Sequence, residues 1–156
     1  MEELVRELAL VLREQVLPHL GSDAARAHED EAAGGDVTFA IDEEAERTLE
    51  RFVAERAPAV AFYSEDRGLV TPSDDASAVL VVDPIDGTRP ALAGLEACCV
   101  SVAAAPLRDG VTMGDVSVGC VVEIPSGVVF LAERGAGLVE SPPVRLSAND
   151  RLERMF

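Results

Sequence analysis

The first twenty residues carry apolar side chains at every third or fourth position. The apolar face consists of Leu4, Leu8, Val11, Leu12 and Val16. This spacing predicts a helix from residue 2 to about residue 20, and Gly21 supplies the stop. The polar, Gly- and Ala-rich segment 22–35 is predicted to be a loop, with His28 as a solvated residue within it.

A second helical pattern occupies the segment between Thr38 and Pro58. Thr38 is a favourable N-cap residue because its hydroxyl can accept a hydrogen bond from a free backbone N–H, and Pro58 cannot continue a helix. The apolar stripe between them consists of Ile41, Ala45, Leu49, Phe52 and Val53. A second helix is therefore predicted to begin near Thr38 and to end at Pro58.

After Pro58 the pattern changes to short apolar runs that are typical of β-strands. The predicted strands are residues 59–63, 78–82, 97–105, 113–123 and 128–132. Asp109-Gly110 and Pro125-Ser126-Gly127 indicate hairpin-type turns between the last three strands. Two leading helices followed by hairpin strands predict an α+β fold, with both helices packed on one face of a mostly antiparallel sheet.

Composition narrows the class of protein. The 156 residues suit one globular domain, and 48% of them are hydrophobic. The formal net charge of -16 argues against a nucleic-acid partner and against an anionic membrane, because both require a basic surface. This charge is compatible with a phosphorylated substrate if a bound cation lies between protein and phosphate. All 13 cationic side chains are arginine, which excludes mechanisms that depend on a catalytic lysine.

The amino terminus and the cysteines indicate no targeting signal and no metal site. Met1-Glu2-Glu3 lacks the basic start of a signal peptide, and no uninterrupted apolar stretch reaches membrane-spanning length, so a cytoplasmic location is expected. Cys98, Cys99 and Cys120 show no metal-binding spacing. Cys98 and Cys99 are predicted to be small buried hydrophobic residues.

The strongest chemical signal is the acidic segment Asp83-Pro84-Ile85-Asp86-Gly87-Thr88, which follows a buried apolar strand. Its two carboxylates, with a carbonyl between them, are the oxygen ligands that Mg²⁺ prefers. Gly87 and Thr88 are predicted to open a helical turn whose free N–H groups bind an anion. The three-residue acid spacing excludes the Asp-x-Asp pattern of haloacid-dehalogenase-type phosphatases and the EF-hand pattern. A solvated Asp-Gly turn is the alternative for this segment taken alone.

Two further acidic elements accompany this segment. Phe62-Tyr63-Ser64-Glu65-Asp66 ends a predicted strand in paired acids, and Asp36-Val37-Thr38-Phe39-Ala40-Ile41-Asp42 places Asp42 in the first turn of the second helix. The three motifs in this order resemble the inositol monophosphatase family, over essentially the whole chain. The resemblance implies that residues 1–156 form the amino-terminal metal-binding domain of such a phosphatase, which is the amino-terminal half of the sugar-phosphatase layered fold.

The resemblance also implies the metal ligands. Glu65 and Asp83, together with the Ile85 carbonyl, would hold a first Mg²⁺, and Asp83 and Asp86 would hold a second one. The family uses two or three Mg²⁺ ions. Its carboxy-terminal half contributes a further aspartate in a Trp-Asp-x-Ala-Ala-Gly segment, which the 156 residues do not contain. One well-held Mg²⁺ is therefore expected here, with a more weakly bound second ion.

Catalytic roles follow from the same resemblance. Asp42 and Thr88 would pair to orient and deprotonate a metal-bound water, and the backbone N–H groups of Gly87 and Thr88 would bind phosphate oxygens. The implied reaction is Mg²⁺-dependent hydrolysis of a small phosphate monoester, such as an inositol phosphate or a sugar phosphate. Lithium sensitivity and a homodimer are also implied. The alternative is a non-catalytic or partner-dependent metal-binding fragment that lacks the second half of the active site.

Two positions depart from the family pattern. Asp66 replaces the second glutamate of the acidic pair, which lies outside the primary ligands. After Thr88 the family usually continues with Asn-Phe, whereas this chain has Arg89. Arg89 is either a contact to phosphate or substrate or a solvated surface residue.

Overall fold

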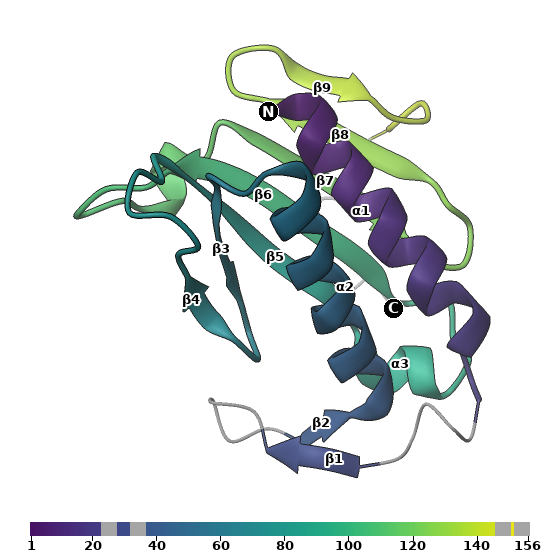
Figure 1. Ribbon diagram of the computed structural model, residues 1–156. Helices are drawn as coiled ribbons and strands as arrows, with labels where there is room; N and C mark the ends of the chain where they lie inside the picture. Colours follow the sequence, from purple (N-terminus) through teal and green to yellow (C-terminus); the bar gives the residue numbers. More distant parts are fainter. Residues whose placement is uncertain (23–27, 32–36, 146–150, 152–156) are drawn as a thin grey trace.

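The computed structural model describes residues 1–22, 28–31, 37–145 and 151. A seven-stranded sheet has the order β4-β3-β5-β6-β7-β8-β9, and two long helices lie side by side across one of its faces (Figure 1). The helices are α1 (Glu2–Val16), α2 (Ala40–Arg56) and the short α3 (Thr88–Leu92), with 3₁₀ turns η1 (Leu17–His19) and η3 (Met113–Asp115). The sheet strands are β3 (Ala61–Ser64), β4 (Gly68–Val70), β5 (Ala78–Asp86), β6 (Cys99–Pro106), β7 (Val118–Glu123), β8 (Val129–Glu133) and β9 (Gly137–Glu140).

All neighbouring strands of this sheet run antiparallel except β3 and β5, which are parallel. The predicted α+β fold, with two helices on one face of a mostly antiparallel sheet, is confirmed. A parallel pair requires a crossover between its strands. Here β4 and the segment after it make that crossover, which brings the end of β3 next to the end of β5.

Helix α1 forms where the apolar stripe predicts it, and its apolar face is buried. Leu8 and Leu12 have no exposed surface, and the helix packs on β5, β6, β7 and α2. The α-helix ends at Val16 rather than near residue 20, because Pro18 has no N–H for a further i→i−4 bond. The chain continues as η1, and His19 lies at the end of this turn.

Helix α2 begins two residues later than predicted, and the prediction of Thr38 as its N-cap is wrong. The N-cap position is Phe39, whose backbone N–H donates to the Asp42 carboxylate at 3.1 Å. Thr38 belongs instead to strand β2 (Val37–Phe39). An acid at the third helical position can bond back to the N-cap backbone, and this interaction sets the start of the helix. Asp42 is therefore held in place by the helix that it caps.

The prediction of an unbroken loop over residues 22–35 is also wrong. Within it, β1 (His28–Glu31) pairs antiparallel with β2. His28 lies in this strand, so its placement in a loop is corrected. The strand is polar, and backbone pairing forms it without any alternation of apolar residues. Residues 23–27 and 32–36, which include Asp36 of the first acidic motif, lie outside the described residues.

The later strands match the predicted ones with three differences. The strand predicted to start at residue 113 starts at Val118, because residues 113–115 form η3 instead. The Asp115 carboxylate accepts both the N–H and the hydroxyl of Thr112, at 2.9 and 3.0 Å, which caps that turn. The short strands β4 and β9 were not predicted, since neither carries a clear apolar alternation. Arg6 of α1 donates to Glu140 of β9 at 2.6 Å, which attaches this edge strand to the helix layer.

The two faces of the sheet have different surroundings. The side chains of Leu80, Val82, Val100 and Val102 are buried under the helices. On the opposite face, Ala61, Val79 and Ala105 form a small buried cluster, whereas Val81 is only partly buried by the described part of the chain. No helix among the described residues is long and apolar enough to cross a membrane.

Candidate active site

A bulge in β5 brings Asp83 and Asp86 to the same face of the sheet. In a regular strand, residues three apart point to opposite faces. Here Asp83 pairs with Ser101 and Asp86 pairs with Cys99, and the register shifts between the two pairs. Ser101 and Cys99 are two residues apart on β6, so their partners on β5 share one face as well. The irregularity occurs at Pro84, which cannot donate to the strand ladder.

Glu65 and Asp83 lie beside the same cavity. The parallel pairing of β3 with β5 places the turn after Ser64 next to the end of β5. The cavity has a volume of about 520 Å³. Its lining residues are Tyr63, Glu65, Gly68, Val81, Val82, Asp83, Ser101, Ala103 and Met113. The acid of the second motif and the first acid of the third motif therefore face a common space on the sheet side away from the helices.

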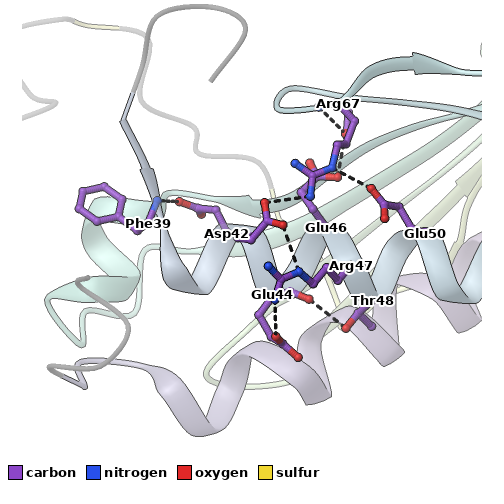
Figure 2. Close-up of polar contacts among 10 residues, drawn as sticks. Phe39, Asp42, Glu44, Glu46, Arg47, Thr48, Glu50 and Arg67 are labelled. Carbon is purple, nitrogen blue, oxygen red and sulfur yellow. Dashed lines mark hydrogen bonds and ion pairs between the residues drawn. The ribbon is translucent and has the colours of Figure 1, made fainter. Parts of the chain in front are cut away.

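Asp42 and Thr88 are in direct contact although 46 residues separate them in the sequence. The Thr88 hydroxyl lies 3.1 Å from Asp42 Oδ1 and 3.1 Å from the Ile85 carbonyl oxygen, so it can donate to either acceptor. The other oxygen of Asp42 accepts the Phe39 N–H (Figure 2). The structure thus joins the first motif to the third through the pair predicted to act on water.

The carboxylates of the site perturb one another. Burial raises the pKa of Asp83 to about 6, and the Asp86, Glu65 and Asp42 carboxylates add to this rise, whereas the Ile85 N–H opposes it. Burial also raises the pKa of Asp42 to about 6, against the stabilising hydrogen bonds from Phe39 and Thr88. Four acids from α2, the β3–β4 turn and β5 therefore lie close enough to repel one another. Such a concentration of negative charge is typical of functional sites.

The residues fit a hard divalent cation by their chemistry. The predicted ligands are carboxylates and one carbonyl, and a bound cation would offset the repulsion that raises the pKa of Asp83. Among the described residues, however, no three His, Cys, Asp or Glu side chains are already grouped closely enough to hold a metal. Glu65 and Asp86 are exposed, so both have room to turn toward Asp83. The ligand assignment of Glu65, Asp83, Ile85 and Asp86 stays a prediction.

Gly87 and Thr88 begin a helical turn, as the sequence predicts. Gly87 is the N-cap of α3, and the Ala91 N–H donates to its carbonyl at 3.0 Å. The first N–H groups of a helix have no acceptor within the helix, so those at this end are oriented outward. Phosphate binding by Gly87 and Thr88 stays a prediction. Arg89 lies in α3 and is exposed.

A sequence model of the inositol monophosphatase family matches residues 1–155. This chain belongs to the inositol monophosphatase family. No curated protein sequence matches it significantly.

Solved structures support the fold of this family member. Extragenic suppressor protein SuhB from Bartonella henselae is 22% identical, with a TM-score of 0.75, over 96% of this chain and 55% of its own. An inositol monophosphatase from Thermotoga maritima is 24% identical, with a TM-score of 0.68, over 95% of this chain and 52% of its own. A protein described as inositol monophosphatase-fructose 1,6-bisphosphatase is 19% identical, with a TM-score of 0.74, over 90% and 52%. This chain spans about half the length of these structures.

The contact of Cys99 with the acidic motif was not predicted from the sequence. The Cys99 thiol lies 3.7 Å from Asp86 Oδ2, and burial followed by the Asp86 charge raises the pKa of the thiol to about 11. Cys98 is buried as expected, but Cys99 is only partly buried. The sequence signal that could have indicated this contact is the alternation of side chains between the two faces of β6. Because Val100 faces the helices, its neighbour Cys99 faces the site.

Gly87 is expected to tolerate no side chain. Its φ of +94° is unfavourable for an L-residue, and a Cβ would lie 2.6 Å from the Ala97 carbonyl oxygen. We expect Gly87→Ala to lower the free energy of unfolding by at least about 2 kcal/mol. Thermal or urea unfolding measures this loss. The matched control is Gly135→Ala, which has a similar φ of +85° but nothing within 4 Å of a Cβ. Equal losses in the two variants would contradict a role for the close contact with Ala97.

Proposed function

We propose that this chain is the amino-terminal half of a Mg²⁺-dependent phosphatase that hydrolyses a small phosphate monoester. Inositol phosphates and sugar phosphates are the proposed substrate class. The proposal is supported by membership of the inositol monophosphatase family and by the name of one similar structure, an inositol monophosphatase-fructose 1,6-bisphosphatase. Residues 1–156 would form its metal-binding domain.

The observation that carries the proposal is the contact between Asp42 and Thr88 beside the acids of β5. An enzyme that uses water as the nucleophile needs a base held beside the attacking water. The pKa of Asp42, raised to about 6, keeps this carboxylate mainly ionised at neutral pH yet gives it the basicity to accept a proton. The Thr88 hydroxyl, 3.1 Å away, donates to one Asp42 oxygen and can accept a hydrogen bond from a water.

The remaining residues would place metal and phosphate. Glu65, Asp83, the Ile85 carbonyl and Asp86 would hold Mg²⁺, which when bound lowers the pKa of a coordinated water and neutralises phosphate charge. The N–H groups of Gly87 and Thr88 would donate to phosphate oxygens at the start of α3. The net charge of the chain is -16, so its acidic surface repels a phosphate group. The bound Mg²⁺ and the N–H groups would offset this repulsion.

Phosphate release with added Mg²⁺ tests the proposal. The assay would use a panel of inositol phosphates, sugar phosphates and nucleotide monophosphates, together with calorimetric titration of Mg²⁺. Mg²⁺ binding together with release from inositol or sugar phosphates supports the proposal. Absence of both Mg²⁺ binding and phosphate release would refute it.

A second function is favoured by one observation, the half-length match to the solved structures. In this alternative the chain is a metal-binding subunit that is inactive alone and acts only with a partner. Mg²⁺ binding without phosphate release is the result that distinguishes it from a self-sufficient enzyme.

Lithium sensitivity, a homodimer and a cytoplasmic location stay predictions.

A further inference from the structure

Hydrogen bonds join the turn between β3 and β4 to helix α2 on both sides of Glu65. The turn consists of Glu65, Asp66 and Arg67, between the paired residues Ser64 and Gly68. Glu65 itself is exposed and lines the cavity beside Asp83. Ser64 before it and Arg67 after it, in contrast, make specific polar contacts with α2.

The first attachment is buried. Ser64 has no exposed surface, and Glu46 of α2 is 2% exposed. The Ser64 hydroxyl donates to Glu46 Oε2 at 2.9 Å and accepts the backbone N–H of Arg67 at 3.3 Å. One hydroxyl therefore links the helix to both ends of the turn. A buried carboxyl group is costly unless it is hydrogen-bonded, so the bond from Ser64 stabilises Glu46 at this position.

The second attachment is a pair of charged hydrogen bonds from Arg67. Its Nε donates to Glu50 at 2.7 Å, and its Nη2 donates to Glu43 at 2.8 Å. Burial lowers the pKa of Arg67, but the hydrogen bonds to Glu50 and Glu43 outweigh burial and hold the pKa above its ordinary value, so the side chain stays charged. Figure 2 shows Arg67 lying over α2 and extending toward Glu50.

The same helix carries Asp42 at its first turn. Glu43, Glu46 and Glu50 are spaced by three and four residues, so they share the face of α2 that meets the turn. Asp42 lies one residue before Glu43 and contacts Thr88 of the β5 motif. Helix α2 is thus attached at one end to the motif that contains Asp83 and along its side to the turn that contains Glu65.

We propose that Arg67, through Glu43 and Glu50, is a positioning residue that holds the β3–β4 turn so that Glu65 faces Asp83. This inference rests on the proposed function, because Glu65 matters only if a metal binds there. Residues that orient metal ligands typically change metal affinity by about 10–100-fold when they are replaced. The contribution of Arg67 is geometric, since its guanidinium bonds to helix α2 rather than to the acids of the site.

The test is a titration of the full 156-residue chain with Mn²⁺. Electron paramagnetic resonance measures the concentration of free Mn²⁺ and so gives the binding affinity. We expect Arg67→Ala to weaken Mn²⁺ binding by about 10-fold, with partial recovery in Arg67→Lys, which can reach only one carboxylate at a time. The matched control is Arg47→Ala. Arg47 also bonds to Glu43, at 3.1 Å, but through an exposed pair within the helix, so we expect affinity within about twofold of the unchanged chain.

A second measurement separates positioning from loss of folding. Circular dichroism at the titration temperature shows whether each variant is folded. If Arg67→Ala is unfolded, Glu50→Gln replaces it, because this change weakens one of the two bonds and keeps the other. Hydrogen exchange of the Arg67 amide, which donates to Ser64, should accelerate in Arg67→Ala or Glu50→Gln and not in Arg47→Ala.

The outcomes are distinct for the two proposals. Mn²⁺ binding that is weakened in the folded Arg67 or Glu50 variant, but not in Arg47→Ala, supports the positioning role. Equal binding in the unchanged chain and in that folded variant overturns the role and leaves the proposed function standing. If the unchanged chain binds no Mn²⁺, the metal site itself is refuted, and the positioning role with it.

Discussion

Asp83→Asn is expected to lower Mg²⁺ affinity by at least about 100-fold. Asp83 is the acid assigned to both ions, and the bulge in β5 places it on the same face as Asp86. An amide oxygen is a neutral and weaker ligand for a hard cation than a carboxylate. Calorimetric titration of Mg²⁺ measures the loss, and the increase of the melting temperature on adding Mg²⁺ should disappear with it.

The same substitution is expected to stabilise the metal-free protein. The pKa of Asp83 is raised to about 6, mainly by burial and then by the neighbouring Asp86 carboxylate, so its ionised form is disfavoured in the folded state. At pH 7.5 a neutral asparagine avoids this cost. After a discount for partial exposure, we expect a gain of about 1 kcal/mol, or roughly 3 °C, in the presence of a chelator. The opposite signs of the two effects are typical of a site whose acids are placed for a ligand.

Asp74→Asn is the matched control for Asp83→Asn. It removes the same charge from an exposed position in the segment that precedes β5, at the end of that strand away from Asp83. It should leave both Mg²⁺ affinity and metal-free stability close to those of the unchanged chain. Unaltered Mg²⁺ affinity in Asp83→Asn would show that the ligand assignment is wrong.

Glu46→Gln is expected to remove a large part of the pH dependence of stability. Burial raises the pKa of Glu46 to about 7, against the hydrogen bond from Ser64 and the charge of Arg67. Between its ordinary pKa and 7, the folded protein keeps a proton on Glu46 that the unfolded chain has lost. The unfolded state therefore binds fewer protons, and the contribution of Glu46 to stability falls as the pH rises through this window.

The size of the effect follows from the shift. A rise from 4.5 to about 7 corresponds to about 3 kcal/mol. We therefore expect the free energy of unfolding of Glu46→Gln, relative to the unchanged chain, to rise by about 2–3 kcal/mol between pH 5 and pH 8. This comparison cancels any constant cost of the new amide. Urea unfolding at several pH values measures it.

The control for Glu46→Gln is Glu55→Gln, at an exposed position of the same helix. Its stability relative to the unchanged chain should stay constant between pH 5 and pH 8, because this side chain is exposed to solvent in the folded state as in the unfolded one. A pH-independent difference for Glu46→Gln as well would show that Glu46 is not a buried titrating group.

Local patterns were sufficient for the long elements. The apolar stripes of α1 and α2, and the apolar runs of β5, β6 and β8, predicted these elements within a few residues. Turn residues predicted the start of α3 at Gly87. The pattern failed for β1, β4 and β9, which have only three or four residues each. Backbone pairing with a neighbouring strand forms such short strands and leaves no clear signal in their own residues.

The candidate residues of the site could also be named from the sequence, but their geometry could not. Three acidic motifs in order indicated the residues that are proposed to form the site. A spacing of three between Asp83 and Asp86 does not by itself place both on one face; the bulge between them does. The roles of Glu46 and Arg67 left no motif at all, although the spacing of Glu43, Glu46 and Glu50 on one helix face was visible in the sequence.

The sequence alone determined the family, the helix layer and the oxygen-rich character of the acidic motifs, because residue type and periodicity are local properties. Only the tertiary structure decided which of these acids face one another. The contact of Asp42 with Thr88 spans 46 residues, and that of Arg67 with Glu43 spans 24. Such contacts depend on the parallel pairing of β3 with β5 and on the packing of α2, which no local pattern of residues encodes.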